Sequence, residues 1–360
     1  MEKTVRFAVV GATGAVGREM IAVLTERGLA NDELRLLASS RSAGTEVEVN
    51  GSSVTVEELT ADSFEGIDIA LFSAGGGVSK EFAPYAVKAG AVVIDNSSAW
   101  RMEPNIPLVV PEVNSDVLRS ALRDAGENGV IIANPNCSTI QLAVVLKPLH
   151  DAAGLKRVVV STYQSVSGAG QKGMDELWSQ ALAIFNQQEV QVEKFPHQIA
   201  FNCIPHIDEF QPGGYTKEEL KVVNESRKIL GIPDLRITAT AVRVPVFYAH
   251  SESVNVETVR PLSADEARKV LERSPGVMVV DTPCERAYPL PTDVAGTDAT
   301  YVGRIRNDDS VENGLNLWVV ADNVRKGAAL NAVQIAEIVM SERFPSDERN
   351  AKSAGVHALV

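Results

Sequence analysis

The stretch with the clearest chemical potential is 134–139, which reads Asn-Pro-Asn-Cys-Ser-Thr. An apolar run at 130–133 predicts a buried strand before it, and the apolar run at 140–146 predicts a buried helix after it. Asn136 is a favourable N-cap residue, and the proline before it helps to fix the turn. Cys137 is therefore expected in the first turn of a helix that follows a strand.

This position would suit a nucleophile. The free N–H groups and the dipole at a helix N-terminus favour an anion, which lowers the pKa of a thiol from about 8.5. The same N–H groups could hold an oxyanion formed when the Cys137 sulfur attacks a carbonyl. The alternative is a small buried core cysteine, which is the commoner fate of a free cysteine.

A glycine-rich turn near the N-terminus predicts a dinucleotide site. A short β-rich run at 5–10 leads into Gly-Ala-Thr-Gly-Ala-Val-Gly at 11–17, and 19–27 has helical spacing. The pattern G-x-x-G-x-x-G is a variant of the dinucleotide fingerprint, in which glycines let a pyrophosphate approach the helix N-terminus. Glycines also serve turns for purely conformational reasons, but the flanking strand and helix favour cofactor binding. The candidates are Gly11, Thr13, Gly14, Ala15, Val16 and Gly17.

The residues after the second predicted strand, 34–38, bear on the choice of cofactor. An NAD site normally has an acid here for the ribose 2′-hydroxyl, whereas this chain reads Ser-Ser-Arg-Ser-Ala-Gly at 39–44. The hydroxyls of Ser39 and Ser42 and the guanidinium of Arg41 suit a 2′-phosphate, so we infer NADP over NAD. A solvated polar turn would also explain the serines, but not the missing acid.

Strands and helices go on alternating through the first half. The strand at 67–72 opens into Ser73, Ala74 and Gly75, whose small size would admit the cofactor, although a simple turn would look the same. A strand at 91–94 leads to Arg101, which could grip an anion or be an ordinary surface residue. This alternation implies a parallel, doubly wound sheet with ligands at the strand C-termini.

The second half has a different pattern. Alternating, β-branched runs at 157–163, 237–246, 250–259 and 315–320 suggest a mixed or antiparallel sheet. Residues 216–230 predict a capped amphipathic helix, on which Glu218 and Lys221 share a face. That pair could be a ligand clamp, but an intrahelical ion pair is the simpler interpretation. An amphipathic helix at 326–343 is expected to pack back against the first half.

Of the five histidines, His250 is the candidate for proton transfer, because it lies at a strand boundary beside Ser-Glu-Ser. A histidine satisfied by these polar neighbours is the alternative.

Composition limits the function classes. A chain of 360 residues favours two domains, and a net charge of −13 argues against a nucleic-acid binder. The three cysteines, Cys137, Cys203 and Cys284, have neither disulfide-framework nor metal-site spacing, so we expect no metal and a reducing, cytoplasmic setting. Apolar runs of membrane-spanning length and a signal-like N-terminus are missing from the sequence, so no membrane partner is expected.

These features together resemble the aspartate-semialdehyde dehydrogenase family along nearly the whole chain. The region 171–198 matches it least, which leaves the dimer surface and the rim of the site open. The matching stretches are 11–17, 39–44, 72–75, 110–114, 135–139, 161–164, 200–202, 243–246, 249–253, 302–304 and 322–323.

The resemblance implies a role for each matched site residue. Cys137 would be the nucleophile, His250 the acid/base and Gln164 the residue that orients the acyl group. Substrate would be held by Arg101, Asn136 and Lys221 at its phosphate and by Glu218 and Arg243 at its ammonium and α-carboxylate. NADP would be bound by the glycine turn, by Ser39, Arg41, Ser42, Ser73, Ala74 and Gly75, and by Ser167, Gly168 and Asn323, with Asn323 near the nicotinamide.

The implied fold is an N-terminal doubly wound, Rossmann-type NADP-binding domain (1–136 and 324–345) and an α+β catalytic and dimerisation domain with a mixed sheet (137–323). Residues 346–360 would form a tail. The implied reaction is attack of Cys137 on aspartyl 4-phosphate, loss of phosphate to leave a thioester, and reduction by NADPH to aspartate 4-semialdehyde. This semialdehyde precedes diaminopimelate, lysine, threonine and methionine, and the enzyme would be a homodimer.

Two other functions remain open from the sequence. A reductase of N-acetylglutamyl phosphate would share the cofactor half and a cysteine. A non-catalytic dinucleotide sensor would keep the fold, but Cys137, Gln164, Arg243 and His250 together weigh against it.

Overall fold

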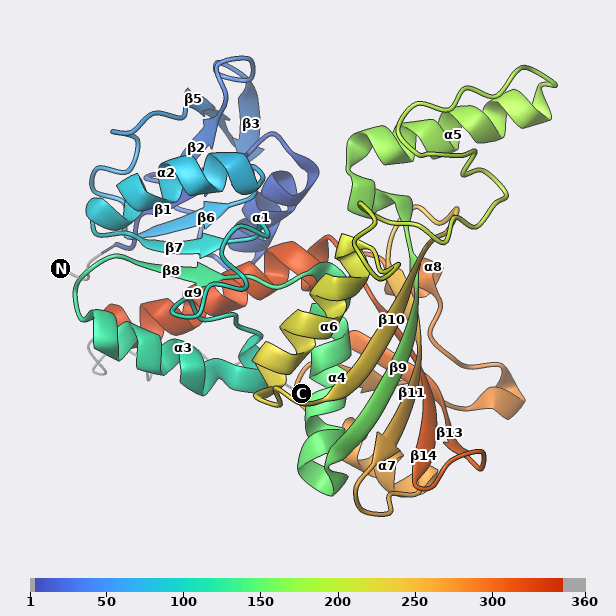
Figure 1. Ribbon diagram of the computed structural model, residues 1–360. Coiled ribbons are helices and arrows are strands. Elements are labelled where there is room, and N and C mark those ends of the chain that lie inside the picture. The colour runs from blue at the N-terminus through green and yellow to red at the C-terminus, as the bar shows by residue number, and fades with distance from the viewer. Residues whose placement is uncertain (1–3, 346–360) are drawn as a thin grey trace.

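The protein, described here from a computed structural model at residues 4–345, contains two six-stranded sheets (Figure 1). The first sheet is parallel throughout, in the order β5-β2-β1-β6-β7-β8, which confirms the predicted parallel sheet. Its strands are β1 (Phe7–Val10), β2 (Arg35–Ala38), β5 (Glu57–Glu58), β6 (Ile69–Phe72), β7 (Val92–Asp95) and β8 (Val130–Ala133). The predicted tail, 346–360, lies outside the described residues.

Helices cover both faces of the first sheet, because alternate residues of a strand point to opposite faces. On one face Val9 and Leu71 pack in a core with α1, α3 and α9, and on the other Ala8 and Ala70 pack with Ala83 of α2. Their bounds are α1 (Ala15–Glu26), α2 (Gly76–Lys88), α3 (Pro111–Ala125) and α9 (Leu330–Arg343). A small hairpin of β3 (Glu46–Val49) and β4 (Ser52–Thr55), which the sequence patterns did not predict, follows β2.

The second sheet has the order β10-β9-β11-β14-β13-β12. It is mixed, as predicted: β9 with β10 and β12 with β13 are parallel, and the other pairs are antiparallel. The strands are β9 (Leu155–Gln164), β10 (Arg236–Arg243), β11 (His250–Thr258), β12 (Val277–Val279), β13 (Thr300–Asp308) and β14 (Gly314–Ala321). β12 and β13 were not predicted.

One face of this sheet carries the helices α4 (Cys137–Ala153), α6 (Lys217–Leu230) and α7 (Ala264–Glu272) (Figure 1). Val160, Val254 and Leu317 of the strands share a buried core with them. Thr216 and Glu219 form a capping box at the start of α6, so the predicted capped helix is confirmed.

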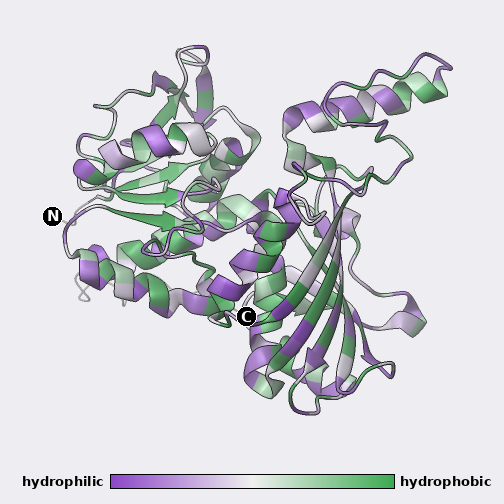
Figure 2. Ribbon diagram, viewed as in Figure 1, coloured by the Kyte–Doolittle hydropathy of each residue, from purple (hydrophilic) through white to green (hydrophobic). Residues whose placement is uncertain are grey.

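A helical arm extends from the second sheet. After η1 (Val166–Ala169), helix α5 (Gln171–Phe185) projects away from the rest of the chain, and apolar residues mark its outer end (Figures 1 and 2). Trp178 and Phe185 are exposed, the latter by 73%. The remaining short elements are η2 (Pro283–Glu285), α8 (Pro291–Val294) and the π-helical turn η3 (Arg325–Ala329).

The chain returns to the first sheet through η3 and α9. The packing predicted for 326–343 is confirmed, since Val333 and Ala336 lie in the core of the first sheet. The prediction of one amphipathic helix is wrong, because the segment opens with a π-helical turn and is buried on most sides between that sheet and its helices. Even Lys326 is buried, where its ammonium pairs with Glu112 at 2.8 Å.

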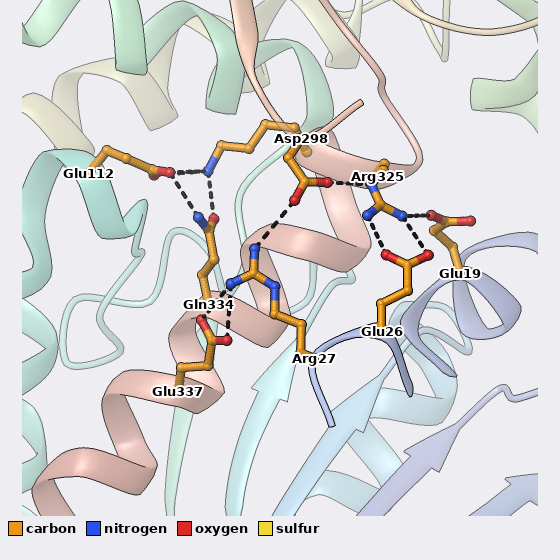
Figure 3. Close-up of polar contacts among 9 residues, drawn as sticks. Glu19, Glu26, Arg27, Glu112, Asp298, Arg325, Gln334 and Glu337 are labelled. Atoms are coloured by element: carbon orange, nitrogen blue, oxygen red, sulfur yellow. Dashed lines mark hydrogen bonds and ion pairs between the residues drawn. The ribbon is translucent and has the colours of Figure 1, made fainter. Parts of the chain in front are cut away.

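Ion pairs join η3 to the helix that follows the glycine turn. Arg325 pairs with Glu19 at 3.0 Å and Glu26 at 2.5 Å, both on α1, and with Asp298, which also pairs with Arg27 at 3.3 Å (Figure 3). Partly exposed pairs of this kind contribute about 0–1 kcal/mol each. These pairs hold the segment after β14 against α1, the helix that follows the glycine turn.

Candidate active site

Cys137 is the first residue of α4, directly after β8, as the sequence predicts. The side chain of Asn136 caps this helix and accepts hydrogen bonds from the Ser138 and Thr139 N–H groups at 3.1 and 3.3 Å. Two of the first-turn N–H groups therefore already have a partner, so the prediction that donors of this turn could hold an oxyanion is not met by free Ser138 and Thr139 groups. An added Cβ on Gly327 of η3 would lie 3.0 Å from the Cys137 Cβ, so η3 packs directly against the thiol's residue.

The predicted lowering of the Cys137 pKa is also wrong. Burial raises the pKa of this thiol to about 12, and the charge of Glu218 adds to the effect. The positive charges of Arg243 and Arg101 act in the opposite direction but do not outweigh it. Without ligands the sulfur is therefore a thiol, and its proton must leave as it attacks.

A cavity of about 450 Å³ opens over Cys137. It brings together eight of the predicted residues, Arg101, Asn136, Cys137, Gln164, Gly168, Glu218, Lys221 and Arg243. It is also lined by Lys194, His206 and Asp208, which sequence reasoning missed. Lys194 lies in the 171–198 segment that matched the family pattern least, and His206 and Asp208 lie in a loop with no recognisable motif.

Glu218 is the centre of the polar contacts in this cavity. Its Oε1 accepts hydrogen bonds from the side-chain amides of Asn136 at 2.9 Å and Gln164 at 3.2 Å, and its Oε2 lies 3.1 Å from the Lys221 ammonium. Burial acts to raise the pKa of Glu218, but Lys221 and these hydrogen bonds outweigh it and hold the pKa below its ordinary value. The ion pair expected between Glu218 and Lys221 is present, and it lines the cavity.

Arg101 is buried and held rigidly. Its guanidinium donates to the carbonyls of Asn134 at 2.9 Å and Asn96 at 2.8 Å and pairs with Glu225 at 3.1 Å. Glu225 also accepts the Asn136 N–H at 2.7 Å, so one carboxylate links Arg101 to the Cys137 turn. Sequence reasoning missed Glu225, although it follows Glu218 by seven residues and so shares its helix face.

His250 begins β11 and presents one free nitrogen. Its Nδ1 accepts the Ser165 N–H at 3.1 Å, which leaves the proton of the neutral ring on Nε2, and Nε2 has no hydrogen-bond partner among residues 4–345. Burial and the nearby charge of Arg243 hold the pKa of His250 well below its ordinary value, so the ring is neutral. The sequence left a satisfied histidine as the alternative; here only one nitrogen is satisfied.

Gly168 allows Arg243 and His250 to reach the same space. A Cβ on Gly168 would lie 2.9 Å from Arg243 Nη1 and 3.2 Å from His250 Nε2. Arg243 also donates to the Ser165 carbonyl at 2.7 Å. Asn323 completes this side of the site: its Oδ1 accepts from the hydroxyls of Ser165 and Ser167 at 3.0 Å each. Ser167 and Asn323 therefore lie together beside His250.

The glycine turn between β1 and α1 has the geometry of a close-approach site. Gly11 has φ +84°, and a Cβ there would lie 3.0 Å from the Ser73 carbonyl group. A Cβ on Gly17 would lie 2.1 Å from the Gly11 oxygen, so neither position accepts a side chain without distortion. Gly14 is the N-cap of α1 and supplies no side-chain cap, which leaves the backbone donors of Ala15, Val16 and Gly17 uncapped by a side chain.

The predicted cofactor residues of the other strands of the first sheet follow β2 and β6. Gly75 is the N-cap of α2, also without a side-chain cap, and the Ser73 hydroxyl lies 3.2 Å from the Val10 carbonyl. Arg41 is exposed in the turn after β2 with Ser39, and Ser42 beside it is partly buried. The residues present thus fit a dinucleotide: a cradle that side chains would fill, two uncapped helix N-termini, and a cation after β2.

Two further observations concern sites and partners. Within residues 4–345 no three His, Cys, Asp or Glu side chains gather as metal ligands. No helix of that part of the chain is both long and apolar enough to cross a bilayer.

Comparison with known proteins agrees with this geometry. The profile described as "Semialdehyde dehydrogenase, NAD binding domain" matches residues 6–121, and "Semialdehyde dehydrogenase, dimerisation domain" matches 146–326. The chain is 56% identical over 339 residues to an aspartate-semialdehyde dehydrogenase of Aquifex aeolicus, covering 94% of this chain and 98% of the relative.

Solved structures give the same result. The crystal structure of aspartate semialdehyde dehydrogenase II from Vibrio cholerae complexed with ASA superposes with a TM-score of 0.89 and 49% identity, over 95% of this chain and 100% of that one. The enzyme from Candida albicans with NADP gives a TM-score of 0.73 and 26% identity, over 94% of this chain and 99% of that one.

Proposed function

The chain belongs to the aspartate-semialdehyde dehydrogenase family, and from this premise we propose that it is an oxidoreductase that converts L-aspartyl 4-phosphate to L-aspartate 4-semialdehyde through a thioester on Cys137. The observation that carries the proposal is the charge pattern around Cys137. Arg101 and Lys221 suit the phosphate of such a substrate, and Glu218 and Arg243 suit its ammonium and α-carboxylate.

The first chemical step would use the thiol itself. The Cys137 sulfur attacks the β-carbonyl, the C–O bond to phosphate breaks, and phosphate leaves toward Arg101 and Lys221, which leaves a thioester. Because the pKa of the thiol is raised, its proton must be taken up as the C–S bond forms. His250 could accept it on Nε2 if its own proton were on Nδ1. The Nδ1–H would then donate to the Ser165 hydroxyl, 2.9 Å away, and the hydrogen bond that Nδ1 accepts from the Ser165 N–H would be lost.

The second step would reverse that proton movement. NADPH, when bound, supplies a hydride to the thioester carbonyl. As the hemithioacetal collapses, the C–S bond breaks, and the departing sulfur takes a proton from His250 Nε2. A sulfur with a high pKa needs such a donor. Gln164 donates hydrogen bonds to Ser138 at 2.7 Å and to Glu218 at 3.2 Å, and from this fixed position it would orient the acyl group.

The cofactor would be NADP. Gly11, Thr13, Gly14, Ala15, Val16 and Gly17 would take the pyrophosphate, with Ser73, Ala74 and Gly75 beside it. Ser39, Arg41 and Ser42 would take the 2′-phosphate, and Ser167, Gly168 and Asn323 the nicotinamide side. The Candida albicans relative solved with NADP supports this choice for the family.

The assembly would be a homodimer. The match of 146–326 to a dimerisation domain supports it, and so do the exposed aromatic side chains of α5, Trp178 and Phe185. We keep 1–136 with 324–345 as the cofactor domain and 137–323 as the catalytic domain, since α9 packs in the core of the first sheet. We also propose a cytoplasmic location, which suits the free cysteines.

The reverse assay tests the function. Aspartate semialdehyde, NADP and inorganic phosphate are mixed with the protein, and NADPH is followed by absorbance. We expect repeated turnover only when all three are present, because without phosphate each site can form one thioester and one NADPH at most. The control substrate is N-acetylglutamate semialdehyde, which has a neutral amide where Glu218 would meet an ammonium. Equal turnover of the two semialdehydes, or none of either, would refute the proposal.

A further inference from the structure

The two cations assigned to phosphate are held by different kinds of partner. Arg101 pairs with Glu225, a buried carboxylate that also accepts the Asn136 N–H. Lys221 pairs with Glu218 at 3.1 Å and, more closely, with Asp208 at 2.7 Å. Asp208 lies in the loop between α5 and α6, and its side chain is 31% exposed. The second cation is thus occupied by a carboxylate at the rim of the cavity.

Asp208 is the carboxylate that can leave. Glu218 and Glu225 are buried and fixed by several donors from other elements. The carboxylate of Asp208 is held by Lys221 and by the N–H of the next residue, Glu209, at 2.9 Å. Its backbone has φ +68°, a left-handed conformation that Asp and Asn tolerate better than most residues.

A phosphate in this cavity would compete with Asp208. An ammonium has three N–H donors, and Lys221 already gives one to each of its two carboxylates. A dianion that used Lys221 fully would also lie beside the negative charge of Asp208, which is unfavourable. Partial burial acts to raise the pKa of Asp208, but the opposite effects of Lys221 and the Glu209 N–H together are larger and hold the pKa below its ordinary value. The carboxylate is therefore ionised.

We propose that Asp208 is an internal competitor for phosphate: it occupies Lys221 when no phosphate is present and is displaced by the phosphate of the substrate or by inorganic phosphate. This rests on the proposed function, because it takes Lys221 as a phosphate ligand. In the reductive direction Asp208 would return to Lys221 as phosphate leaves, which favours product release. The residue thereby sets phosphate affinity without touching the reacting carbon.

If Asp208 had a purely structural role, its loss would change phosphate affinity in the opposite direction. If Asp208 served to orient Lys221 for phosphate, its loss would weaken phosphate binding. If it competes, its loss strengthens binding. The sign of the change therefore separates the two roles.

The test is calorimetric titration of inorganic phosphate into the full-length protein and two variants. Asp208→Asn keeps the shape and tolerates the left-handed backbone, but removes the charge. A partly exposed ion pair of ordinary strength corresponds to roughly a two- to fivefold change, so we expect Asp208→Asn to lower the Kd for phosphate by about that factor. Glu209→Gln is the matched control: it removes the same charge one residue away, where Glu209 pairs with Lys217, and should leave the Kd unchanged.

Steady-state kinetics, and the same substitution in a Lys221→Met protein, complete the test. Asp208→Asn should lower the KM for phosphate and leave the KM for aspartate semialdehyde unchanged. In a Lys221→Met background, most of the gain in phosphate affinity should disappear. A folded Asp208→Asn protein that binds phosphate equally or more weakly overturns the proposal, and so does no detectable phosphate binding by either protein. Binding is measured without turnover, so a protein that lacks dehydrogenase activity but shows the gain would contradict only the proposed function.

Discussion

Two of the helices that begin directly after strands of the first sheet, α1 and α4, have N-termini that are built differently. α1 follows β1 through a glycine turn and has Gly14 as an N-cap without a side chain. α4 follows β8 and has Asn136, whose side chain accepts from Ser138 and Thr139. The first helix leaves its donors to a ligand, whereas the second uses them internally.

The difference shows how one local unit can serve two purposes. At α1 the proposed recognition is by backbone groups, which requires the absence of side chains at Gly11 and Gly17. At α4 the cap fixes Asn136, and its amide then donates to Glu218, so the turn positions side chains for a substrate. We therefore assign cofactor binding to the N-terminus of α1 and bond formation to the N-terminus of α4.

Cys137→Ala should separate the two units completely. Turnover is lost because no sulfur remains to form the thioester, while NADPH binding is kept because the glycine turn is untouched. Activity is measured by the reverse assay and NADPH binding by fluorescence titration. Substantial residual turnover would show that another group attacks.

His250→Asn should lower kcat by about 10²–10⁴-fold, the usual contribution of a positioned acid/base group. Asn retains a polar side chain near Ser165 but cannot carry a proton between steps. Steady-state kinetics give the effect, and a thermal melt checks the fold. An unchanged kcat would assign this histidine a structural role.

Gly14→Asp would give α1 the kind of cap that α4 has. The carboxylate would take up the first-turn donors and place a negative charge where the pyrophosphate is expected, so the Kd for NADPH should rise roughly 100-fold. The stability of the folded protein should change by only about a few tenths of a kcal/mol, because Gly is itself a fair cap. Gly14→Ala is the control, and an equal loss with Ala would point to steric exclusion instead.

Arg41→Ala should weaken NADP binding by about 1.5 kcal/mol, roughly tenfold, because one charge-assisted bond is lost at an exposed site. NAD lacks the 2′-phosphate, so its Kd should barely change. Titrations with both cofactors give the ratio. Equal losses would remove Arg41 from the cofactor site.

Glu218→Gln should raise the KM for aspartate semialdehyde and leave that for NADP nearly unchanged, since only the substrate carries an ammonium. It should also lower the Cys137 pKa below about 12, because the Glu218 charge helps to raise it. Thiolate absorbance would thus appear at lower pH than in the parent protein, in a background with Cys203 and Cys284 replaced by Ser. An unchanged KM would contradict the substrate assignment.

The local parts of this picture could be predicted from the sequence. The strand, cap and helix around Cys137 depend on neighbouring residues, and so do the glycine turn and the capped helix that carries Glu218. Contacts between distant segments could not be predicted. Glu225 reaches Arg101 across 124 residues, and Ser165 and Asn323 meet beside His250 only when β9 and β14 flank β11.

The sequence predicts the wrong direction for the Cys137 pKa shift, again because contacts between distant segments decide it. The helix N-terminus is visible in the sequence and favours the thiolate. Burial and the charge of Glu218 come from tertiary structure and outweigh it. The buried Lys326 is a further case, since its partner Glu112 lies on another helix far away in the sequence.

The most direct test of the account is to trap the acyl group on Cys137. The protein is mixed with aspartate semialdehyde and NADP without phosphate, quenched in acid, and examined by intact-protein and peptide mass spectrometry. We predict an added aspartyl group on the peptide that contains Cys137, its disappearance when phosphate is supplied before the quench, and its absence from Cys137→Ala. An acyl group on another residue, or NADPH formed without any adduct on Cys137, would contradict the thioester mechanism.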